Sequence, residues 1–320
     1  MIVLTNEEIS SLLSFKEIIE AVESAMVSYE GNSCIVPKRM HIDHGNNTLL
    51  CMPAFNDSFF ATKLVSVVPG NKSKKLPVTI GALLLNDTVT GLPLALMNAE
   101  KLTALRTGAV GAIGIKYTTP AAIDSVGLIG CGIQGVHQAI FACSVRNIKQ
   151  IFAFDNVQTC VGKLVAIVNK HHPTVHVVPC SSAKEVLDKT TVIITATTSS
   201  GAILPNDTSL LEGKHFIGIG SYKPTMQELP DHVFSLAKQL VIDSEFARRE
   251  TGDIINPIQK GLLKDEDVFT IGKLITGERT ININETTVYK SAGMALYDLF
   301  AAEAMYKKAV EENIGTTIDF

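Results

Sequence analysis

The sequence predicts an α/β protein in which a doubly wound parallel sheet is joined to a second domain of the α+β class. From residue 124 to residue 242, short apolar runs alternate with helical stretches, which is typical of a parallel sheet with crossover helices. A glycine-rich turn directly follows the first of these runs. The length of 320 residues also corresponds to two domains of the usual ~100–200 residues.

The elements before residue 120 predict the second domain. Thr5 and Glu8 form a capping-box pattern, and the apolar residues that follow have helical spacing as far as Tyr29. Residues 34–100 change to short apolar runs separated by turn sequences, which predicts strands, mainly antiparallel. A helix over Ala99–Tyr117 is rich in small residues. Because glycine lowers helix stability, this composition indicates close packing against a neighbouring backbone.

The parallel sheet is expected to contain six strands after a boundary near Pro120. Their expected ranges are 125–129, 148–154, 175–178, 191–196, 215–218 and 239–242. The last apolar-periodic stretch, Thr286–Val310, predicts one long helix that folds back onto the first domain.

The composition excludes several classes of protein. With 46% hydrophobic and 19% charged residues and a net charge of −4, the chain is neither disordered nor globally attracted to nucleic acid or to anionic membranes. No apolar run reaches the ~18 residues that span a bilayer, and the first residues lack the basic region of a signal peptide. We therefore expect a cytoplasmic protein. The six cysteines and eight histidines show no metal-ligand spacing, so no metal is expected.

The glycine-rich turn predicts a dinucleotide site. Residues 130–135 read Gly-Cys-Gly-Ile-Gln-Gly, a G-x-G-x-x-G pattern between an apolar strand and a helical stretch. Gly130 makes the tight turn, Gly132 lets the backbone approach a pyrophosphate, and Gly135 lets the helix pack on the strand. The start of the helix, at Ile133 and Gln134, then receives the negative charge. This arrangement is that of a Rossmann-type domain.

Two further segments extend the expected cofactor site. Asp155 follows the second strand, 20 residues after the last glycine of the pattern. Its carboxylate can accept hydrogen bonds from the ribose hydroxyls and would repel a 2′-phosphate, so NAD(H) is expected to be preferred, with NADP(H) as the alternative. Small polar residues end the strand near residue 195 and can line the cofactor crevice at Ala196, Thr197 and Thr198, although a polar strand end is nearly as good an interpretation.

Three cations lie in apolar or turn-forming surroundings in the first domain: Arg39, Lys63 and Arg106. A buried cation requires an anionic partner, and a substrate carboxylate held by arginine is one candidate. The alternative is that each is a surface or salt-bridged cation, and from the sequence alone this alternative is favoured for each of the three.

The chain resembles the ornithine cyclodeaminase/mu-crystallin family over essentially its full length. The matching stretches are Pro37-Lys38-Arg39-Met40, residues 61–65, 69–71 and 86–95, Leu105-Arg106-Thr107-Gly108-Ala109, the glycine pattern, residues 220–230 and Lys290-Ser291-Ala292-Gly293. The resemblance implies a homodimer, with residues 1–120 and 298–320 forming a substrate-binding and dimerisation domain and residues 121–297 the NAD(P)-binding domain.

The resemblance also implies roles for individual residues. Arg39, Lys63 and Arg106 fall where the family faces the substrate carboxylate. Ser291 and Ala292 are expected to contribute to the substrate site. The positions where the family touches the cofactor are Arg106, Thr107, Asp155, Ser221 and Ser291.

Two departures from the cyclodeaminases point to a reductase. The cyclodeaminases carry an acidic residue where this chain has Leu50 and an Asp where it has Tyr222, so binding and deprotonating a diamino acid is disfavoured. The loop at residues 220–229 resembles that of the family's reductases of Δ1-pyrroline-2-carboxylate and Δ1-piperideine-2-carboxylate. The expected reaction is NAD(P)H-dependent reduction of such a ketimine to L-proline or L-pipecolate, with Lys63 or Tyr222 keeping the nitrogen protonated.

Three rival functions are also compatible with the sequence. One is an amino-acid dehydrogenase of the alanine type, which uses an open-chain 2-oxo acid and ammonia. Another is the cyclodeaminase itself. The third is a non-catalytic binding protein that keeps the nucleotide site. The presence of all three cations, Arg39, Lys63 and Arg106, disfavours this third function.

Overall fold

The structure, a computed structural model, describes residues 1–319 and divides them into two compact units. Unit 1 contains Met1–Arg106 and the residues from Met294 onward, and unit 2 contains Thr107–Gly293. Both contain a sheet with helices, and the sheet of unit 2 is wholly parallel, as expected for an α/β protein with a second domain.

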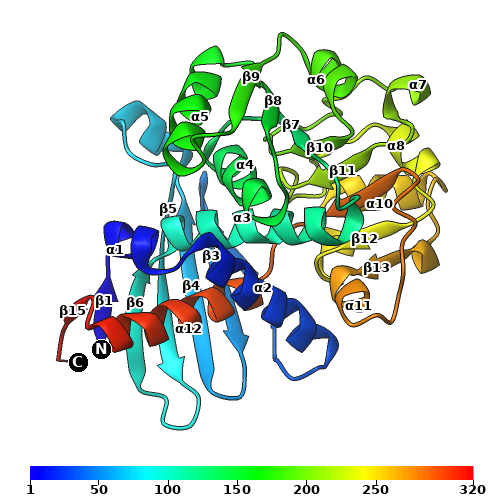
Figure 1. Cartoon of the computed structure of the whole chain (residues 1–320). Coiled ribbons are helices and arrows are strands. Elements are labelled where there is room, and N and C mark those ends of the chain that lie inside the picture. The colour runs from blue at the N-terminus through cyan, green and yellow to red at the C-terminus, as the bar shows by residue number, and fades with distance from the viewer. Residues whose placement is uncertain (320) are drawn as a thin grey trace. The chain divides into compact units, whose positions relative to one another are not determined.

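Unit 1 is built on a seven-stranded mixed sheet with the order β15-β1-β6-β5-β4-β3-β2 (Figure 1). Its strands are β1 (Ile2–Leu4), β2 (Met40–His44), β3 (Asn47–Phe55), β4 (Phe59–Val67), β5 (Thr79–Asp87), β6 (Pro93–Asn98) and β15 (Thr316–Thr317). The pairs from β2 to β6 are antiparallel, as predicted, whereas β1 pairs with β6 in parallel.

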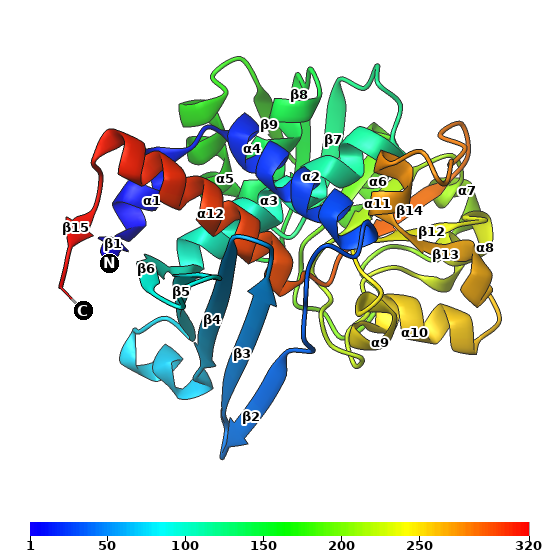
Figure 2. The ribbon, with the colours of Figure 1, turned by 90° about the horizontal axis from the view of Figure 1, so that it is seen from below.

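Helices cover one face of this sheet. They are α1 (Asn6–Leu12), α2 (Phe15–Glu30) and α12 (Ala295–Glu312), with the short 3-10 helix η1 (Pro69–Lys74) outside this layer. Helix α12 lies on β3 and β4, and α2 packs on α12 (Figure 2). Side chains alternate between the two faces of a strand, so Met52, Lys63 and Leu83 share the covered face and are buried.

The N-terminal helical stretch is two helices, not one. Ser14 interrupts it and forms a second capping box, in which the Ser14 side chain accepts from the Glu17 amide and Glu17 accepts from the Ser14 amide. Both helices bury apolar residues at helical spacing, so the apolar period continues across Ser14. Periodicity alone therefore did not reveal the break between the two helices.

Helix α3 (Ala99–Thr118) begins in unit 1 and continues in unit 2. The sequence placed residues 107–120 in the first domain, but the structure groups them with unit 2. The reason is close packing at two small residues. A Cβ at Gly111 would lie 1.7 Å from Gln138 Oε1, and a Cβ at Gly114 would lie 2.1 Å from the ring of Tyr289. Glycine is therefore required at these two positions, where the helix packs closely on other elements of unit 2.

Unit 2 is built on an eight-stranded parallel sheet with the order β13-β12-β14-β11-β10-β7-β8-β9. Its strands are β7 (Ser125–Ile129), β8 (Gln150–Phe154), β9 (His176–Pro179), β10 (Val192–Thr195), β11 (His215–Gly218), β12 (Leu240–Ile242), β13 (Val268–Thr270) and β14 (Thr287–Lys290). From β9 to β14 the order is the doubly wound order of a Rossmann-type domain.

Helices lie on both faces of this sheet (Figure 1). They are α4 (Ile133–Val145), α5 (Gln158–His171), α6 (Ala183–Lys189), α7 (Thr208–Leu211), α8 (Asp231–Leu236), α9 (Ala247–Glu250), α10 (Gly252–Gln259) and α11 (Ile271–Ile275), with the 3-10 helix η2 (Asp265–Asp267). The two faces are distinguished on β7: a Cβ at Gly127 would contact Val186 of α6, whereas Leu128 lies near Gly135 of α4.

The last part of the chain differs from the prediction. The stretch Thr286–Val310 is not one helix, because Thr287–Lys290 forms β14 and the helix begins at Ala295. Strand β14 was not predicted and inserts between β11 and β12, and the strand predicted at residues 239–242 is present as β12. Helix α12 does return to unit 1, as expected. No helix within residues 1–319 has the length and apolar character needed to cross a membrane.

Candidate active site

A buried charge cluster lies in unit 1. Lys63 on β4 and Arg106 on α3 are both buried and share the carboxylate of Asp298 on α12. Lys63 Nζ donates to Asp298 Oδ2 at 2.6 Å, and Arg106 Nε donates to Asp298 Oδ1 at 3.0 Å. Two of the three cations identified in the sequence are thus brought together, through a residue that was not predicted from the sequence.

A signal for Asp298 was present in the sequence. Residues Asp298, Ala302, Met305 and Ala309 recur at helical spacing and are all buried on α12. A carboxylate within an apolar stripe is unusual, because an unpaired buried charge is costly. Its partners are distant in sequence, 235 residues away for Lys63 and 192 for Arg106, so the pairing itself could not be read from the sequence.

Opposing effects set the charge states in this cluster. Burial lowers the pKa of Lys63 to about 8, assisted by the positive charges of Arg106 and Arg39 and opposed by Asp298. Burial raises the pKa of Asp298, but the charges of Arg106 and Lys63 outweigh it and hold that pKa below its ordinary value. At neutral pH two buried cations therefore share one carboxylate, which leaves an excess of positive charge.

Arg39 lies next to this cluster. Arg39 directly precedes β2, in which Met40 pairs with Cys51. Because successive side chains point to opposite faces of a sheet, Arg39 lies on the same face as Met52 and Lys63. The charge of Arg39 contributes to the lowered pKa of Lys63, after burial and the charge of Arg106.

The position that is acidic in the cyclodeaminases also faces the cluster. Leu50 pairs with Val65 and lies on the same face of the sheet as Met52 and Lys63. A carboxylate at position 50 would lie diagonally across the β3–β4 pair from Lys63, whereas the leucine in this chain supplies no charge there.

In unit 2, the candidate cofactor residues gather at the carboxyl edge of the parallel sheet. The glycine pattern follows β7, Ala196–Thr198 follow β10, Ser221 comes shortly after β11 and Ser291 follows β14. The strand order reverses between β7 and β10, because β8 and β9 continue on one side of β7 and β10 lies on the other. Crevices at such a reversal are where doubly wound sheets bind ligands.

The loop formed by the glycine pattern at residues 130–135, the glycine loop, has a shape that fits a dinucleotide. Gly130 has φ +94°, and a Cβ there would lie 2.6 Å from the Ala196 carbonyl oxygen. A Cβ at Gly135 would lie 1.9 Å from the Gly130 carbonyl oxygen, so the start of α4 packs directly on the loop. Gly132, by contrast, is the N-cap of α4 and has no atom within 4 Å of its Cβ position.

This loop also leaves a polar atom without a partner. Gln134 Oε1, in the first turn of α4, is buried and has no hydrogen-bond partner. Open space at Gly132 and a helix N-terminus together fit a nucleotide whose phosphates lie on the loop, whereas the unpaired amide oxygen can accept only from a donor such as a ribose hydroxyl. Gly130, Gly132, Ile133, Gln134 and Gly135 are therefore suited to hold the pyrophosphate.

Asp155 lies against the same loop. Its Oδ2 accepts from the Cys131 amide at 2.7 Å, and its Oδ1 accepts from the Val157 amide at 2.7 Å. The carboxylate is thus held at the end of β8, beside the glycine pattern, where a ribose would follow the pyrophosphate.

A second buried carboxylate, Glu228, joins two of the edge loops. Its Oε1 accepts from the amide and hydroxyl of Thr197 at 2.7 and 2.8 Å. Its Oε2 accepts from the Thr195 hydroxyl at 3.0 Å and from the amides of Gly220 and Ser221 at 2.7 and 3.3 Å. Burial raises the pKa of Glu228, against the charge of Lys290 and the donors of Thr197.

Two aspartates hold the remaining loops of this edge. Asp253 accepts from the Ser221 hydroxyl at 2.5 Å and from the amides of Glu228 and Leu229. Asp243 Oδ2 accepts from the Ser291 hydroxyl at 2.6 Å and from the amides of Ala292 and Gly293. Ser221 and Ser291 were predicted from the sequence but neither of these acids was, and both acids are fully buried although acids usually lie at the surface.

The other selected residues of unit 2 differ in exposure. Thr107, which lies within α3 and is the first residue of unit 2, is buried, and its carbonyl accepts from Gln138 Nε2 at 2.7 Å. Thr198 is exposed, and Tyr222 is 46% exposed with the Lys223 ammonium 5.6 Å from its ring centre. Tyr222 is therefore accessible to a ligand at this edge.

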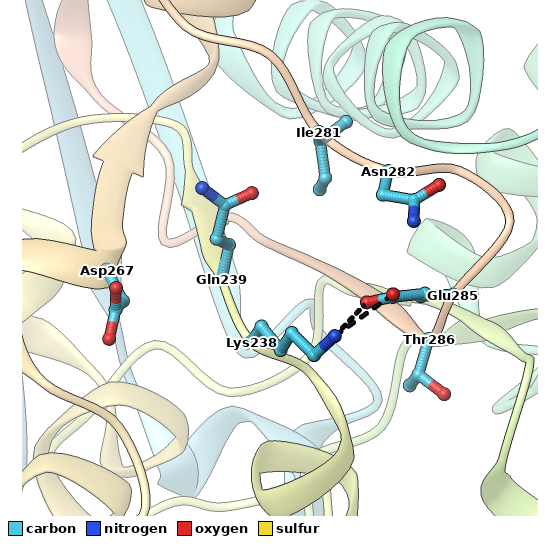
Figure 3. Close-up of a pocket in the computed structure, with 7 residues that line it drawn as sticks. All are labelled: Lys238, Gln239, Asp267, Ile281, Asn282, Glu285 and Thr286. Carbon is cyan, nitrogen blue, oxygen red and sulfur yellow. Dashed lines mark hydrogen bonds and ion pairs between the residues drawn. The ribbon is translucent and has the colours of Figure 1, made fainter.

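A surface pocket of unit 2 lies away from these residues. It is lined by Lys238, Gln239, Asp267, Ile281, Asn282, Glu285 and Thr286 (Figure 3). Several of these residues directly precede β12, β13 and β14, so the pocket is at the amino edge of the sheet, opposite the glycine loop. Lys238 and Glu285 form an ion pair across it. Within residues 1–319, no three His, Cys, Asp or Glu side chains are grouped to hold a metal.

Comparison with known proteins agrees with this architecture. A curated relative, the Δ1-pyrroline-2-carboxylate reductase of Bacillus cereus, is 33% identical over the full length of both chains. The structure of Thermococcus litoralis Δ1-pyrroline-2-carboxylate reductase with NADH and L-proline is 31% identical, with a TM-score of 0.91 over 99% of this chain and 100% of that one. The structure of an archaeal alanine dehydrogenase dimer with bound NAD is also 31% identical, with a TM-score of 0.92 over 100% of this chain and 99% of that one.

The family assignment follows from a match along nearly the whole chain. Residues 1–313 match the model of the ornithine cyclodeaminase/mu-crystallin family. Together with the full-length relatives and the shared fold, this match shows that the chain belongs to the ornithine cyclodeaminase/mu-crystallin family.

Proposed function

We propose that this protein is an NADH-dependent ketimine reductase that converts Δ1-pyrroline-2-carboxylate, Δ1-piperideine-2-carboxylate or both to L-proline and L-pipecolate. The observation that carries the proposal is the buried cluster of unit 1, in which Lys63 and Arg106 share the single carboxylate of Asp298. The excess positive charge suits a small anionic substrate, and the relatives named above support the choice of an imino acid.

The substrate carboxylate is assigned to Arg39, Lys63 and Arg106. A substrate carboxylate that enters the cluster adds a second negative charge to that of Asp298, so the charges of the two buried cations are balanced. Arginine can bind a carboxylate through two parallel hydrogen bonds, so it fixes the orientation of the acid group as well as its position. In this proposal Ser291 and Ala292 complete the substrate site.

The nucleotide is assigned to the carboxyl edge of unit 2. The glycine loop and the start of α4 hold the pyrophosphate, and Asp155 holds the adenosine ribose. The remaining contacts are assigned to Arg106, Thr107, Ala196, Thr197, Thr198, Ser221 and Ser291. The bound cofactor supplies the hydride. Because the Asp155 carboxylate would repel a 2′-phosphate, we propose that NADH is preferred over NADPH.

The donor of the proton that the imine nitrogen receives is assigned to Lys63 or Tyr222. Hydride addition to a C=N bond is favoured when the nitrogen is protonated, so a donor near the imine assists the reaction. Lys63 has a pKa of about 8 and can both hold and release a proton near neutral pH. Tyr222 is exposed and has a hydroxyl that can act directly or through water.

An alanine-type dehydrogenase is the second candidate function. The archaeal alanine dehydrogenase and the Thermococcus litoralis reductase are equally similar to this chain, at 31% identity each. A cyclodeaminase is disfavoured, because the cluster face carries Leu50 and the loop carries Tyr222 where acids are expected.

A substrate panel tests the proposal. NADH oxidation is followed with each cyclic imine, with pyruvate plus ammonium, and with ornithine. Turnover of a cyclic imine without ammonium supports the ketimine reductase, ammonium-dependent turnover of pyruvate supports the dehydrogenase, and ammonia release from ornithine supports the cyclodeaminase. A parallel series with NADPH tests the cofactor preference. If neither imine is reduced, the proposed function is wrong.

We also propose that the protein is a homodimer whose subunits meet at the uncovered face of the unit 1 sheet. On that face Met40, Ile42, Leu49, Leu64 and Ile80 are 37–52% exposed and stand opposite one another or opposite small residues across β2 to β5. An exposed apolar patch of this kind is typical of an interface. Sedimentation analysis of Leu64→Glu, which places a charge at the centre of the patch, tests it.

A further inference from the structure

Both oxygens of Asp298 are committed to cations that the proposed reaction uses. Lys63 Nζ lies 2.6 Å from Oδ2, and Arg106 Nε lies 3.0 Å from Oδ1. The three side chains come from β4, α3 and α12, and all are buried, so Asp298 fixes where two segments of the chain present their charges. A substrate that is held by Lys63 and Arg106 would thus be positioned indirectly by Asp298.

Positive groups dominate the remaining surroundings of Lys63. Arg106 on α3 and Arg39 ahead of β2 both act on it, and the Thr103 hydroxyl lies 3.4 Å from Nζ. Its cross-strand neighbours on β3 and β5, Met52 and Leu83, are apolar. Burial and the two arginines all favour neutral Lys63, and Asp298 supplies the opposing negative charge.

We propose that Asp298 is a positioning residue for the reaction, whose carboxylate keeps the Lys63 ammonium charged and directs it toward the imine of the substrate. This inference rests on the proposed function, in which Lys63 contacts the substrate. It assigns Lys63, rather than Tyr222, as the proton donor. Asp298 acts only through Lys63 and Arg106 and has no substrate contact of its own.

The proton balance of the step is simple. The Lys63 ammonium transfers one proton to the imine nitrogen, and the imine carbon receives the hydride from the reduced cofactor. The C=N double bond becomes a CH–NH single bond, and Lys63 is left as a neutral amine. Lys63 then takes a proton from solvent, and the Asp298 carboxylate favours this return because it stabilises the ammonium form.

The test is the pH profile of kcat/KM for wild type and for Asp298→Asn. In wild type we expect activity to fall above pH about 8, where Lys63 loses its proton. Removing an opposite charge at contact distance lowers the pKa of a lysine by about 1–3 units, so the fall in Asp298→Asn should begin at least about one unit lower. Titration of the substrate itself is the same for every variant and does not produce this shift.

Two variants control for general effects. Asp298→Glu keeps the negative charge and is expected to restore the profile to within about half a unit of wild type, even if its KM rises. Glu303→Gln makes the same kind of change on the same helix, at a carboxylate that accepts from Asn56 and Lys307, and is expected to overlay wild type. A purely structural role for Asp298 would lower activity without moving the pH at which it falls.

A second measurement does not depend on the reaction. Competitive acetylation with acetic anhydride at a series of pH values, read by peptide mass spectrometry, reports the titration of Lys63 directly. We expect Lys63 to become reactive at lower pH in Asp298→Asn than in wild type. If wild type reduces neither imine, the proposed function fails while this titration still tests the coupling of Asp298 to Lys63.

Three outcomes would overturn the inference. One is an acetylation curve of Lys63 that is the same in wild type and Asp298→Asn. Another is a shifted curve with an unchanged pH profile, which would show that Lys63 is not the donor. If Asp298→Asn does not fold, Arg106→Gln replaces it. This variant removes both a positive neighbour of Lys63 and the other cation on the Asp298 carboxylate, so Lys63 should become reactive at higher pH. An unchanged or opposite shift would refute the electrostatic coupling of Lys63 to the Asp298–Arg106 pair.

Discussion

Replacing Glu228 by glutamine tests whether one buried carboxylate holds the carboxyl edge of the unit 2 sheet. Glutamine keeps the length and nearly the volume of the side chain but replaces one acceptor oxygen with a donor. In the structure five donors point at this carboxylate, two at Oε1 and three at Oε2. An amide group can satisfy only one of these two sets.

The cost can be worked out from the donors. If the amide nitrogen faces the Oε1 side, the Thr197 hydroxyl can turn to accept from it, but the Thr197 backbone amide loses its partner. If it faces the Oε2 side, the amides of Gly220 and Ser221 both lose theirs, so the first arrangement is cheaper. One unsatisfied buried amide costs about 1–3 kcal/mol, and the weaker bonds to a neutral oxygen bring the loss to about 2–4 kcal/mol.

Two measurements follow from this estimate. Urea denaturation monitored by circular dichroism should show a loss of about 2–4 kcal/mol in the free energy of unfolding of Glu228→Gln. Fluorescence titration should show NADH binding at least about tenfold weaker, because the loops of Thr197 and Ser221 lose their common anchor. The matched control is Glu266→Gln, at a side chain that is 75% exposed, which should change stability by less than about 0.5 kcal/mol.

The result that would refute this reasoning is a Glu228→Gln protein with wild-type stability and wild-type affinity for NADH. Such a protein would mean that the donors find water or other partners at no cost. Lost affinity with unchanged stability would be a different result, in which the carboxylate shapes the loops but does not support the fold.

Four other predictions concern single sites. Gly132→Ala should keep wild-type stability, because its Cβ would meet no atom within 4 Å, but should weaken NADH binding at least about tenfold; equal affinity would contradict the loop assignment. Gly114→Ala should lose about 1–3 kcal/mol in urea, because its Cβ would lie 2.1 Å from the ring of Tyr289. Burial lowers the pKa of His215 to about 4, so its contribution to stability is complete above pH about 6.5 and is lost as the pH falls toward 4; the urea midpoint of His215→Gln should depend less on pH in this range. Asp155→Ala should narrow the preference for NADH over NADPH, measured as the ratio of kcat/KM values, and an unchanged ratio would exclude this carboxylate as its source.

Much of unit 2 was predictable because its signals are local. A buried parallel strand is a short apolar run, and the G-x-G-x-x-G pattern needs only six consecutive residues to specify a turn and a helix start. The prediction of β7 over residues 125–129 and of β11 over residues 215–218 agrees with the structure. The antiparallel strands of unit 1 were predicted for the same reason.

Elements whose limits depend on a distant partner were less accessible. Residues 287–290 are compatible with the helical period that follows them, and they form β14 because they fit between β11 and β12. Likewise, residues 107–118 belong to unit 2 because Gly111 and Gly114 meet Gln138 and Tyr289, which lie outside their own helix.

For the candidate site, the sequence alone determined the glycine loop, Asp155 and the presence of cations in apolar surroundings at Lys63 and Arg106. Only the tertiary structure showed that these two cations share Asp298 and that Glu228 joins two loops of the sheet edge. The physical reason is that a turn or a strand is encoded by neighbouring residues, whereas the pairing of buried charges depends on which segments the fold brings into contact, and Asp298 lies 192 residues from Arg106.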